Sequence, residues 1–423
     1  LNMTPEIKQR IEQIRRGNVP EGYQKTKDGI FPTDWHTQKM KQWVALAERP
    51  VTLEDDKRYR LVTVRRGFGG VDLRGEYLGK DILVKNYFRA RQGDFLISKR
   101  QIAHGACGVV PESLDGAVVS NEYNVFVPNQ GTNIEMFNLM MQLPHYTRLF
   151  YLMSDGVHIE KLLFKTQDWM RRQLAMPPIE EQRKIAAILA TQDEVIELKE
   201  KRFAEKQRQK KYLMQQLLTG KKRLPGFNGT WEKEKLGKCA SMCSGGTPDT
   251  KNEKYYGNDY IWISIKDMTS AGKYICSSER GLTETGLLNC SARLFPKGTI
   301  LFAMYASIGE CSIAETECCS SQAILGIEPD SKLNNEFLYY LLSNSKGYFK
   351  SFGQASSQPN LNKGIVQSIV VQIPEIEEQT AIAEVLSTAD HEIDLLQQDI
   401  EQEKQKKKAL MQLLLTGIVR VKI

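Results

Sequence analysis

The chain has 423 residues, of which 41% are hydrophobic and 26% charged, and its formal net charge is +7. This length predicts two or three domains of about 100–200 residues each, and the composition is that of an ordinary soluble protein. The small basic excess favours a polyanionic partner only slightly. No apolar run approaches about 18 residues and the N-terminal residues do not resemble a signal peptide, so we expect no membrane span and a cytoplasmic protein.

The chain contains eight cysteines, and none of them forms a Cys-x-x-Cys pair. Zinc sites usually show paired cysteines at short spacing. We therefore expect mostly buried thiols and no metal site. The cysteines are Cys107, Cys239, Cys243, Cys276, Cys290, Cys311, Cys318 and Cys319.

Residues 4–16 predict a short helix at the start of the chain. Thr4 is a typical N-cap and Pro5 suits the first helical position. Ile7, Ile11 and Ile14 fall on one face. We expect this apolar face to dock near the end of the second long helix described below.

Two long helical segments form an internal repeat. Residues 177–220 and 374–417 align without a gap and are identical at 21 of 44 positions, against about three expected by chance. Each opens on proline and glutamate, which suit the first helical turn, and each closes on Thr-Gly, with Gly220 and Gly417 expected as C′ residues.

Apolar residues recur in both segments at the 3/4 spacing of a coiled coil, interrupted by charge at Lys206, Lys210, Glu403 and Lys407. About 40 residues at 1.5 Å each make a rod near 60 Å long, more than one domain can cover. We therefore favour pairing of the two helices over each packing on its own domain. The seam is Ile185, Leu189, Ile196, Phe203, Leu213, Leu217, Ile382, Leu386, Ile393, Leu396, Ile400, Leu410 and Leu414.

The globular parts also correspond, though more loosely. Residues 29–35 (GIFPTDW) resemble 225–231 (PGFNGTW), and the strand-like run 93–98 resembles 298–303. The second domain begins just after the first helix and ends where the second helix begins, so the paired helices must run antiparallel. We predict an α+β fold with two similar domains at opposite ends of the coiled coil, related by a pseudo-twofold. The expected segments are 1–20 (N-terminal helical segment), 21–176 (domain 1), 177–220 (helix 1), 221–373 (domain 2) and 374–423 (helix 2 and tail).

Catalytic signatures are missing from the sequence. Residues 67–70 do not make a dinucleotide-binding GxGxxG, and Gly220-Lys221-Lys222 is not a phosphate loop. Pro177-Pro178 is better explained as a helix start than as a methyltransferase motif, and the Pro-Asp pairs at 248 and 329 lack the Glu-x-Lys of a nuclease. The five histidines are scattered at His36, His104, His145, His158 and His391.

Residues 244–248, 255–257 and 261–263 follow one another in the second domain, and 93–100, 105–110 and 118–120 follow one another in the first. In this order, and together with the repeated helices, they resemble the specificity subunit of a type I restriction–modification system. Residues 244–248 (SGGTP), followed by 255–257 and 261–263, resemble the opening of that family's target recognition domain. Residues 298–301 and 307–309 resemble its middle, and 358–361 with 371–374 and 378–382 its junction with the helix. In the first domain, 93–100, 105–110 and 118–120 resemble another subgroup of the same domain.

This resemblance implies that each domain reads one half of an asymmetric, interrupted double-stranded DNA site. It also implies that the helices set the spacing and dock two methyltransferase subunits, to which restriction subunits add. S-adenosylmethionine, ATP and Mg²⁺ would then belong to those partners, and this chain would be non-catalytic, without a cofactor.

The residues that contact DNA are harder to predict. Lysine, arginine and small donors on loops suit phosphates and base edges. Our candidates flank strand-like runs beside glycines, where a loop can approach a groove. In domain 1 they are Arg65, Arg66, Lys99, Arg100, Gln101 and His104, and in domain 2 Gly246, Thr247, Lys266, Tyr305, Ser307, Ser321 and Gln322.

Two other interpretations stay open at this point. The chain could be a bivalent coiled-coil adaptor whose two domains bind proteins, which the small basic excess permits. A self-contained restriction enzyme is the third interpretation, and the missing catalytic motifs argue against it.

Overall fold

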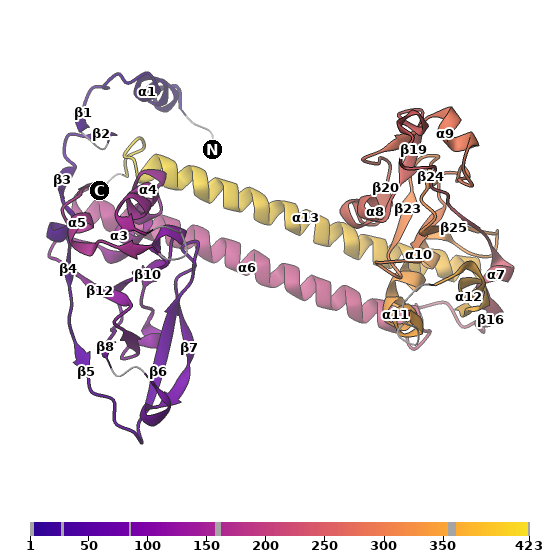
Figure 1. Ribbon diagram of the computed structural model, residues 1–423, viewed down its shortest axis with the longest axis horizontal. Coiled ribbons are helices and arrows are strands. Elements are labelled where there is room, and N and C mark those ends of the chain that lie inside the picture. The colour runs from indigo at the N-terminus through magenta and orange to yellow at the C-terminus, as the bar shows by residue number, and fades with distance from the viewer. Residues whose placement is uncertain (1–3, 27–28, 84–85, 157–161, 354–360, 422–423) are drawn as a thin grey trace. The chain divides into compact units, whose positions relative to one another are not determined.

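The computed structural model describes residues 4–26, 29–83, 86–156, 162–353 and 361–421. The chain divides into two compact units, each described by itself: unit 1 comprises 1–199 and 399–423, and unit 2 comprises 200–398. His158 and residues 358–360 of the predicted domain-helix junction lie outside the described residues. Helices and strands are labelled in Figure 1.

Unit 1 begins with the predicted short helix, α1 (Pro5–Arg15), and the Thr4 side chain accepts a hydrogen bond from Ile7 N at 3.5 Å. Arg10 Nη1 donates to the carbonyl of Ile418 at 2.6 Å, so α1 does lie beside the segment that follows the second long helix. The strands of unit 1 are β1 (Tyr23–Thr26), β2 (Gly29–Pro32), β3 (His36–Lys39), β4 (Val44–Leu46), β5 (Pro50–Val51), β6 (Arg58–Val64), β7 (Val71–Leu78), β8 (Tyr87–Arg89), β9 (Phe95–Ser98), β10 (Cys107–Val109), β11 (Val118–Ser120), β12 (Tyr123–Pro128), β13 (Ser154–Asp155), β14 (Leu163–Phe164) and β15 (Gln173–Met176). Its shorter helices are α2 (Met40–Trp43), α3 (Ile134–Met141), α4 (Pro144–Leu152) and α5 (Thr166–Met170), with 3-10 turns η1 (Gly79–Asp81), η2 (Ile102–His104) and η3 (Glu112–Leu114).

Unit 2 repeats this plan with different additions. Its strands are β16 (Glu232–Lys235), β17 (Ala240–Ser244), β18 (Tyr256–Gly257), β19 (Tyr260–Ile263), β20 (Tyr274–Ile275), β21 (Gly281–Leu282), β22 (Ile300–Ala303), β23 (Cys311–Ala314), β24 (Cys319–Ser320), β25 (Ile324–Pro329) and β26 (Val370–Ile373). Its shorter helices are α7 (Leu236–Cys239), α8 (Ile265–Ala271), α9 (Glu284–Leu288), α10 (Asn335–Asn344), α11 (Lys346–Gly353) and α12 (Lys363–Ser368), with the 3-10 turn η5 (Glu253–Tyr255).

Each unit contains a sheet of the same topology. Its strand order is β10-β9-β12-β4 in unit 1, and the corresponding strands of unit 2 are β23-β22-β25-β17. The central strands β9 and β22 are the predicted matching runs, and all four residues of each are buried. The two units differ in a second sheet. In unit 1, β6 of this sheet is followed by the hairpin strand β7, whereas in unit 2 the strand β19 is followed by helix α8. The predicted α+β class with two similar domains is confirmed.

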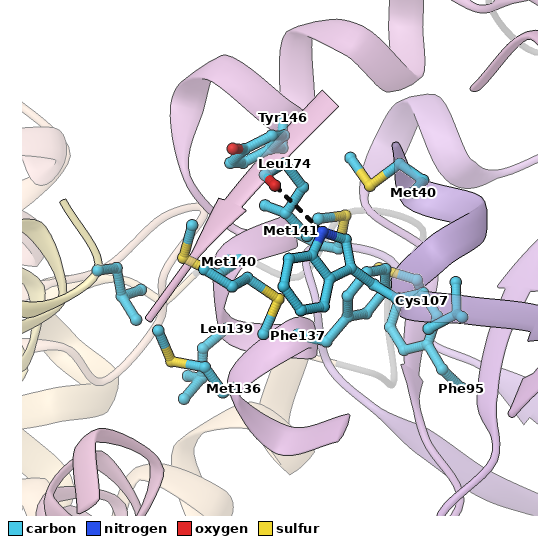
Figure 2. Packing of buried hydrophobic residues seen from close by; sticks show 14 of the residues in the cluster. Met40, Phe95, Cys107, Met136, Phe137, Leu139, Met140, Met141, Tyr146 and Leu174 are labelled. Atoms are coloured by element: carbon cyan, nitrogen blue, oxygen red, sulfur yellow. Dashed lines mark hydrogen bonds between the residues drawn. The ribbon is translucent and has the colours of Figure 1, made fainter. Parts of the chain in front are cut away.

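Each unit has a core that extends onto the long helices. In unit 1, aromatic and methionine side chains from α3 and the central sheet pack together (Figure 2), and Ile185 and Leu189 of the first long helix join them. Trp43 Nε1 donates to the carbonyl of Leu174 at 3.1 Å, which satisfies a polar atom inside this core. In unit 2, Ile382 and Leu386 of the second long helix occupy the equivalent place.

The long helices are α6 (Ile179–Leu217) and α13 (Ile376–Leu414), both of 39 residues. The prolines precede these helices, so the prediction that they lie in the first turn is wrong by one or two residues. The reason is that the chain before α6 must turn at the junction, where Gln182 Nε2 donates to the carbonyl of Pro177 at 2.8 Å. Gly220 and Gly417 have φ of 67° and 69°, as expected of C′ glycines.

The helices run antiparallel within each unit. In unit 1, Lys199 Nζ contacts Asp399 at 2.8 Å, and Lys407 contacts Asp193 at 2.5 Å. In unit 2, Lys206 contacts Glu392 at 2.5 Å, and Lys210 pairs with Asp390. The charged seam positions therefore have partners on the facing helix, which favours one alignment of the two helices. All the apolar residues predicted for the seam are buried or half-buried.

The junctions at the two helix starts are copies of one another. Gln182 Oε1 accepts from Asn133 N, and Gln379 Oε1 accepts from Asn334 N, both at 2.8 Å. One residue earlier, Glu181 accepts hydrogen bonds from Arg420 at 2.7 and 2.8 Å. Glu378 and Arg223 form the same pair in unit 2, at 2.6 Å for both hydrogen bonds.

Five of the eight cysteines are buried and all are free thiols, so the prediction of mostly buried thiols is confirmed. Within the described ranges no helix combines the length and apolar character that crossing a bilayer requires.

Candidate nucleic-acid interface

In unit 1, the structure brings together the two groups of residues that the sequence predicted separately. Arg65 and Arg66 lead into the turn between β6 and β7, and Lys99, Arg100, Gln101 and His104 lie in the loop between β9 and β10. Gly67 N donates to the carbonyl of His104 at 2.7 Å, and Phe68 N donates to that of Gly105 at 2.8 Å. Two segments about 35 residues apart in the chain thus form one continuous loop surface.

In unit 2, three separate loops meet in the same way. Thr247 Oγ1 accepts a hydrogen bond from Gln322 N at 3.4 Å. Met304 N donates to the carbonyl of Ala323 at 2.9 Å, which places the loop of Tyr305 and Ser307 beside the same segment. The predicted residues after β17, after β22 and after β24 therefore form a second loop surface.

Ser321 N donates to the carbonyl of Ile263 at 2.9 Å. This places the start of α8, and with it Lys266, next to the same loops. All seven residues predicted for domain 2 thus gather in one region of unit 2.

The two residues other than glycine that have positive φ in the described chain both lie in these loops. Phe68 has φ of 60° and Ala306 has φ of 55°. Such conformations cost about 1–3 kcal/mol each and concentrate at functional sites. The Phe68 ring lies against Gly105, where an added Cβ would come within 2.9 Å of it, so the ring fixes the turn on the neighbouring loop. Apart from the glycines around Phe68, no sequence pattern predicted either conformation.

Several basic candidates are held in ion pairs on the surface. Arg100 Nε contacts Glu122 at 2.7 Å, and Arg65 pairs with Asp72. Lys266 contacts Glu279 at 2.5 Å, and this hydrogen bond raises the pKa of Lys266. Exposed pairs of this kind are worth about 0–1 kcal/mol, so a phosphate can replace the carboxylate partner at little cost. The sequence did not identify these acidic partners.

Gly246 differs from the expectation, because it is buried. An added Cβ would come within 2.1 Å of Ala292 N, its N–H donates to Ser320 O, and its carbonyl accepts from Trp262 Nε1 at 2.9 Å. Both backbone groups are thus already used, so Gly246 shapes the loop from inside and is withdrawn as a candidate for direct contact. Gln101 Oε1 is buried and has no hydrogen-bond donor in the described part of the chain.

None of the described residues forms a cluster of three or more His, Cys, Asp or Glu side chains suited to holding a metal ion. The predicted contact residues themselves supply hydroxyl, amide and basic groups, which are the types that commonly contact phosphates and base edges.

Residues 228–405 match the family model described as the type I restriction modification DNA specificity domain. This segment contains the second domain and most of α13. The putative specificity subunit of the type I restriction enzyme MjaX from Methanocaldococcus jannaschii is 25% identical over 427 residues, with 95% of this chain and 97% of that protein covered. Over most of its length, this chain is therefore similar to a type I restriction–modification specificity subunit.

Two further similarities extend the comparison. The MjaIX specificity subunit of the same organism is 35% identical over 167 residues, and this alignment spans only 39% of either chain. The crystal structure of the HsdS subunit from Thermoanaerobacter tengcongensis is 19% identical and has a TM-score of 0.52, with 92% of this chain and 98% of that chain covered. At that identity the structural likeness supports the fold alone.

Proposed function

We propose that this chain is the DNA sequence-specificity subunit of a type I restriction–modification complex and is itself non-catalytic. Each domain binds one half of an asymmetric, interrupted DNA site. Because its ligand is genomic DNA, we expect the complex to act in the cytoplasm. The observation that carries the proposal is that one sheet frame occurs twice and presents two different sets of loops.

The physical basis is a division of labour within each domain. The shared strands β9 and β22 are buried and hold the loops in position. The loops then supply arginine, lysine, hydroxyl and amide groups, which position phosphates and read base edges. Since the two loop sets differ, we expect two different half-sites, unlike the palindromes that homodimers read.

The repeated helices provide the frame for partner subunits. In this proposal α6 and α13 set the spacing between half-sites and dock two methyltransferase subunits, and restriction subunits join that core. S-adenosylmethionine, ATP and Mg²⁺ are bound by those partners, and this chain holds no cofactor.

The test is to express the chain with and without its methyltransferase subunit and to map methylated adenines in genomic DNA. An interrupted, asymmetric motif that appears only when both proteins are present supports the proposal. A purified chain that cuts DNA alone, or a complex that methylates without sequence preference, contradicts it.

Variants in the two loop surfaces sharpen the test. Replacing Lys99 and Arg100 with alanine is expected to weaken binding at one half-site only, and the matched variant replaces Ser321 and Gln322 to affect the other half-site. Each lost base contact costs about 1–3 kcal/mol, a factor of roughly 5 to 160 in affinity. Equal loss at both half-sites in either variant would contradict the assignment of the loops.

A third experiment tests the spacing. Inserting four residues in the middle of α6 is expected to change the number of base pairs between the half-sites or to abolish assembly. An unchanged recognition site with full methylation would show that the helices do not set the spacing.

A further inference from the structure

In unit 2, a lysine fills the space between the recognition domain and the long helices. Lys273 lies between α8 and β20, and its Nζ donates to Tyr340 Oη of α10 at 2.7 Å. The same ammonium forms an ion pair with Glu336 and lies 4.5 Å, 4.9 Å and 5.5 Å from the ring centroids of Tyr340, Tyr274 and Tyr339. With a side chain only 13% exposed, Lys273 is enclosed by aromatic rings and a carboxylate.

This arrangement continues onto both helices. Tyr340 Oη donates to Asp390 of α13 at 2.6 Å, and Asp390 pairs with Lys210 of α6. Burial and the hydrogen bond to Asp390 raise the pKa of Tyr340 well above its usual range, so it stays a donor. The space between α10 and the helices is therefore filled and its polar groups are paired.

The equivalent place in unit 1 has smaller residues. Asn133 and Asn334 cap α3 and α10 in the same way. Counting from these caps, Glu135 corresponds to Glu336, whereas Asn138 and Leu139 stand where unit 2 has Tyr339 and Tyr340.

In unit 1, the turn before β7 lies near the place that Lys273 occupies in unit 2, and this turn contains glycine. In unit 2, β20 follows Lys273 directly and pairs with β23. In unit 1, the strand that corresponds to β23 is β10. It packs against the turn before β7, where an added Cβ on Gly108 would lie 2.9 Å from the Gly70 Cα. Counting from the caps, neither Asn138 nor Leu139 supplies the aromatic ring that Tyr339 and Tyr340 supply in unit 2.

An open groove of about 600 Å³ results at this place in unit 1. At about 30 Å³ per water molecule, it holds several side chains of a partner rather than a single ion. The turn Phe68–Gly70, the outer face of α3 and the first turns of α6 form its walls. Its charged lining residues are Glu135, Arg183, Asp193 and Lys407.

Of the charged side chains that line this groove, the Glu135 carboxylate has no cation beside it. Arg183 pairs with Glu180 at 2.8 Å, and Lys407 pairs with Asp193. Glu135 is exposed and has no hydrogen bond or ion pair among the described residues, while partial desolvation by the surrounding chain raises its pKa. Asp193 is also less covered than its counterpart: its side chain is 51% exposed, against 21% for Asp390 beneath Tyr340.

We propose that this groove is a docking site for a basic side chain of the methyltransferase subunit, which pairs with Glu135 as Lys273 pairs with Glu336 in unit 2. The identity of the partner rests on the proposed function. The charge of the occupant follows from the internal repeat, because the same frame holds an ammonium at this position when its own chain provides one. A lysine or arginine that enters the groove supplies the missing cation for Glu135 and can also approach Asp193.

The affinity between the purified chain and its methyltransferase subunit, measured by calorimetry, tests the proposal. Glu135→Gln keeps the shape and removes the charge, and we expect it to weaken the complex at least about tenfold, as the loss of one partner of an interfacial charge pair does. Asn138→Tyr restores the bulk found in unit 2 without changing charge, and we expect a similar loss. Glu112→Gln, an exposed glutamate of the same unit outside the groove, serves as the matched control and should leave the affinity unchanged.

Thermal unfolding and methylome mapping separate the possible outcomes. Weaker complexes of the Glu135 and Asn138 variants, with unchanged Tm and an unaffected Glu112 variant, support the docking site. Unchanged affinity in both groove variants overturns it, while the methylation motif still tests the proposed function. A change in DNA affinity or in self-association, with methyltransferase affinity intact, also overturns it, because the groove would then face nucleic acid or a second copy of the chain. A wild-type chain that binds no methyltransferase contradicts the proposed function itself.

Discussion

The junctions between the globular domain and the long helices are alike in units 1 and 2 at the helix starts, and they differ a few turns further along. At the helix starts, Gln182 and Gln379 make the same three hydrogen bonds, two of them at 2.8 Å in both units and the third at 3.1 Å in unit 1 and 2.8 Å in unit 2. A few turns further along, Lys273 and Tyr340 close the space in unit 2, whereas a groove remains in unit 1. The helix starts are thus kept alike because they set the frame, and the neighbouring residues are free to diverge because a partner side chain can replace an internal one.

The largest effect is expected at the shared part of the junction. Arg420→Ala removes the cation beside Glu181, whose side chain is fully buried. A buried carboxylate that loses its cation costs about 4 kcal/mol, so we expect unit 1 to be strongly destabilised. Hydrogen exchange of α3 peptides measures this, with α10 peptides of unit 2 as the internal control.

The counterpart Arg223→Ala should shift unit 2 in the same direction and spare unit 1, because Arg223 forms the equivalent pair with Glu378. Loss in both units from either single variant would mean that the two junctions are not independent.

A somewhat smaller effect is expected where the units differ. Lys273→Met removes the cation beside Glu336 and the donor to Tyr340 Oη. We expect unit 2 to lose about 3 kcal/mol, the lower end for a broken buried pair, because the Glu336 side chain is 30% exposed. Urea unfolding followed by exchange of α10 peptides measures the loss. Lys266→Met, which removes an exposed lysine of α8, should leave the stability of unit 2 nearly unchanged. Equal effects of the two variants would argue that the lysine between the tyrosines has no structural role.

The glutamines at the helix starts provide a matched pair. Gln182→Ala and Gln379→Ala each remove three hydrogen bonds and leave buried backbone groups unpaired, and we expect each to cost about 2 kcal/mol in its own unit. Differential exchange of α3 and α10 peptides measures both. Losses that differ by several-fold would show that the copied geometry does not carry equal free energy.

The smallest effect concerns acid. Hydrogen bonds from Gln192, Lys199 and Lys406 lower the pKa of Glu403 to about 2 from an ordinary value of 4.5. A carboxylate whose pKa is lowered by folding stabilises the fold fully above pH 4.5, and this contribution is lost as the pH falls toward 2. The urea midpoint followed by circular dichroism should therefore drop over this range. Glu403→Gln should lower the midpoint at neutral pH and flatten the dependence, and an identical pH profile for the variant would contradict the assignment.

Sequence pattern predicted the repeated elements well because their signals are local or periodic. Residue spacing predicted the aligned helices with their glycine ends and the short helix after Thr4. It also predicted the matched strands that end at Ser98 and Ala303. The start of α6 was placed two residues early, since only the junction decides where a chain that contains Pro177 and Pro178 becomes helical. All thirteen candidates for DNA contact gather in two loop regions, with Gly246 buried inside its loop, and which of the others touch DNA stays a prediction.

By itself, the sequence determined that one unit is written twice, that its helices pair antiparallel and that its two domains differ. Periodicity and chain connectivity are enough for that. Only the tertiary structure decided that Gly246 is buried, that Phe68 and Ala306 adopt strained conformations, and that Lys273 is enclosed while Glu135 is not. These features depend on contacts between segments far apart in the chain: Lys273 and Tyr340 are 67 residues apart. No local pattern encodes such a distance, because it is set by how the sheets and helices pack.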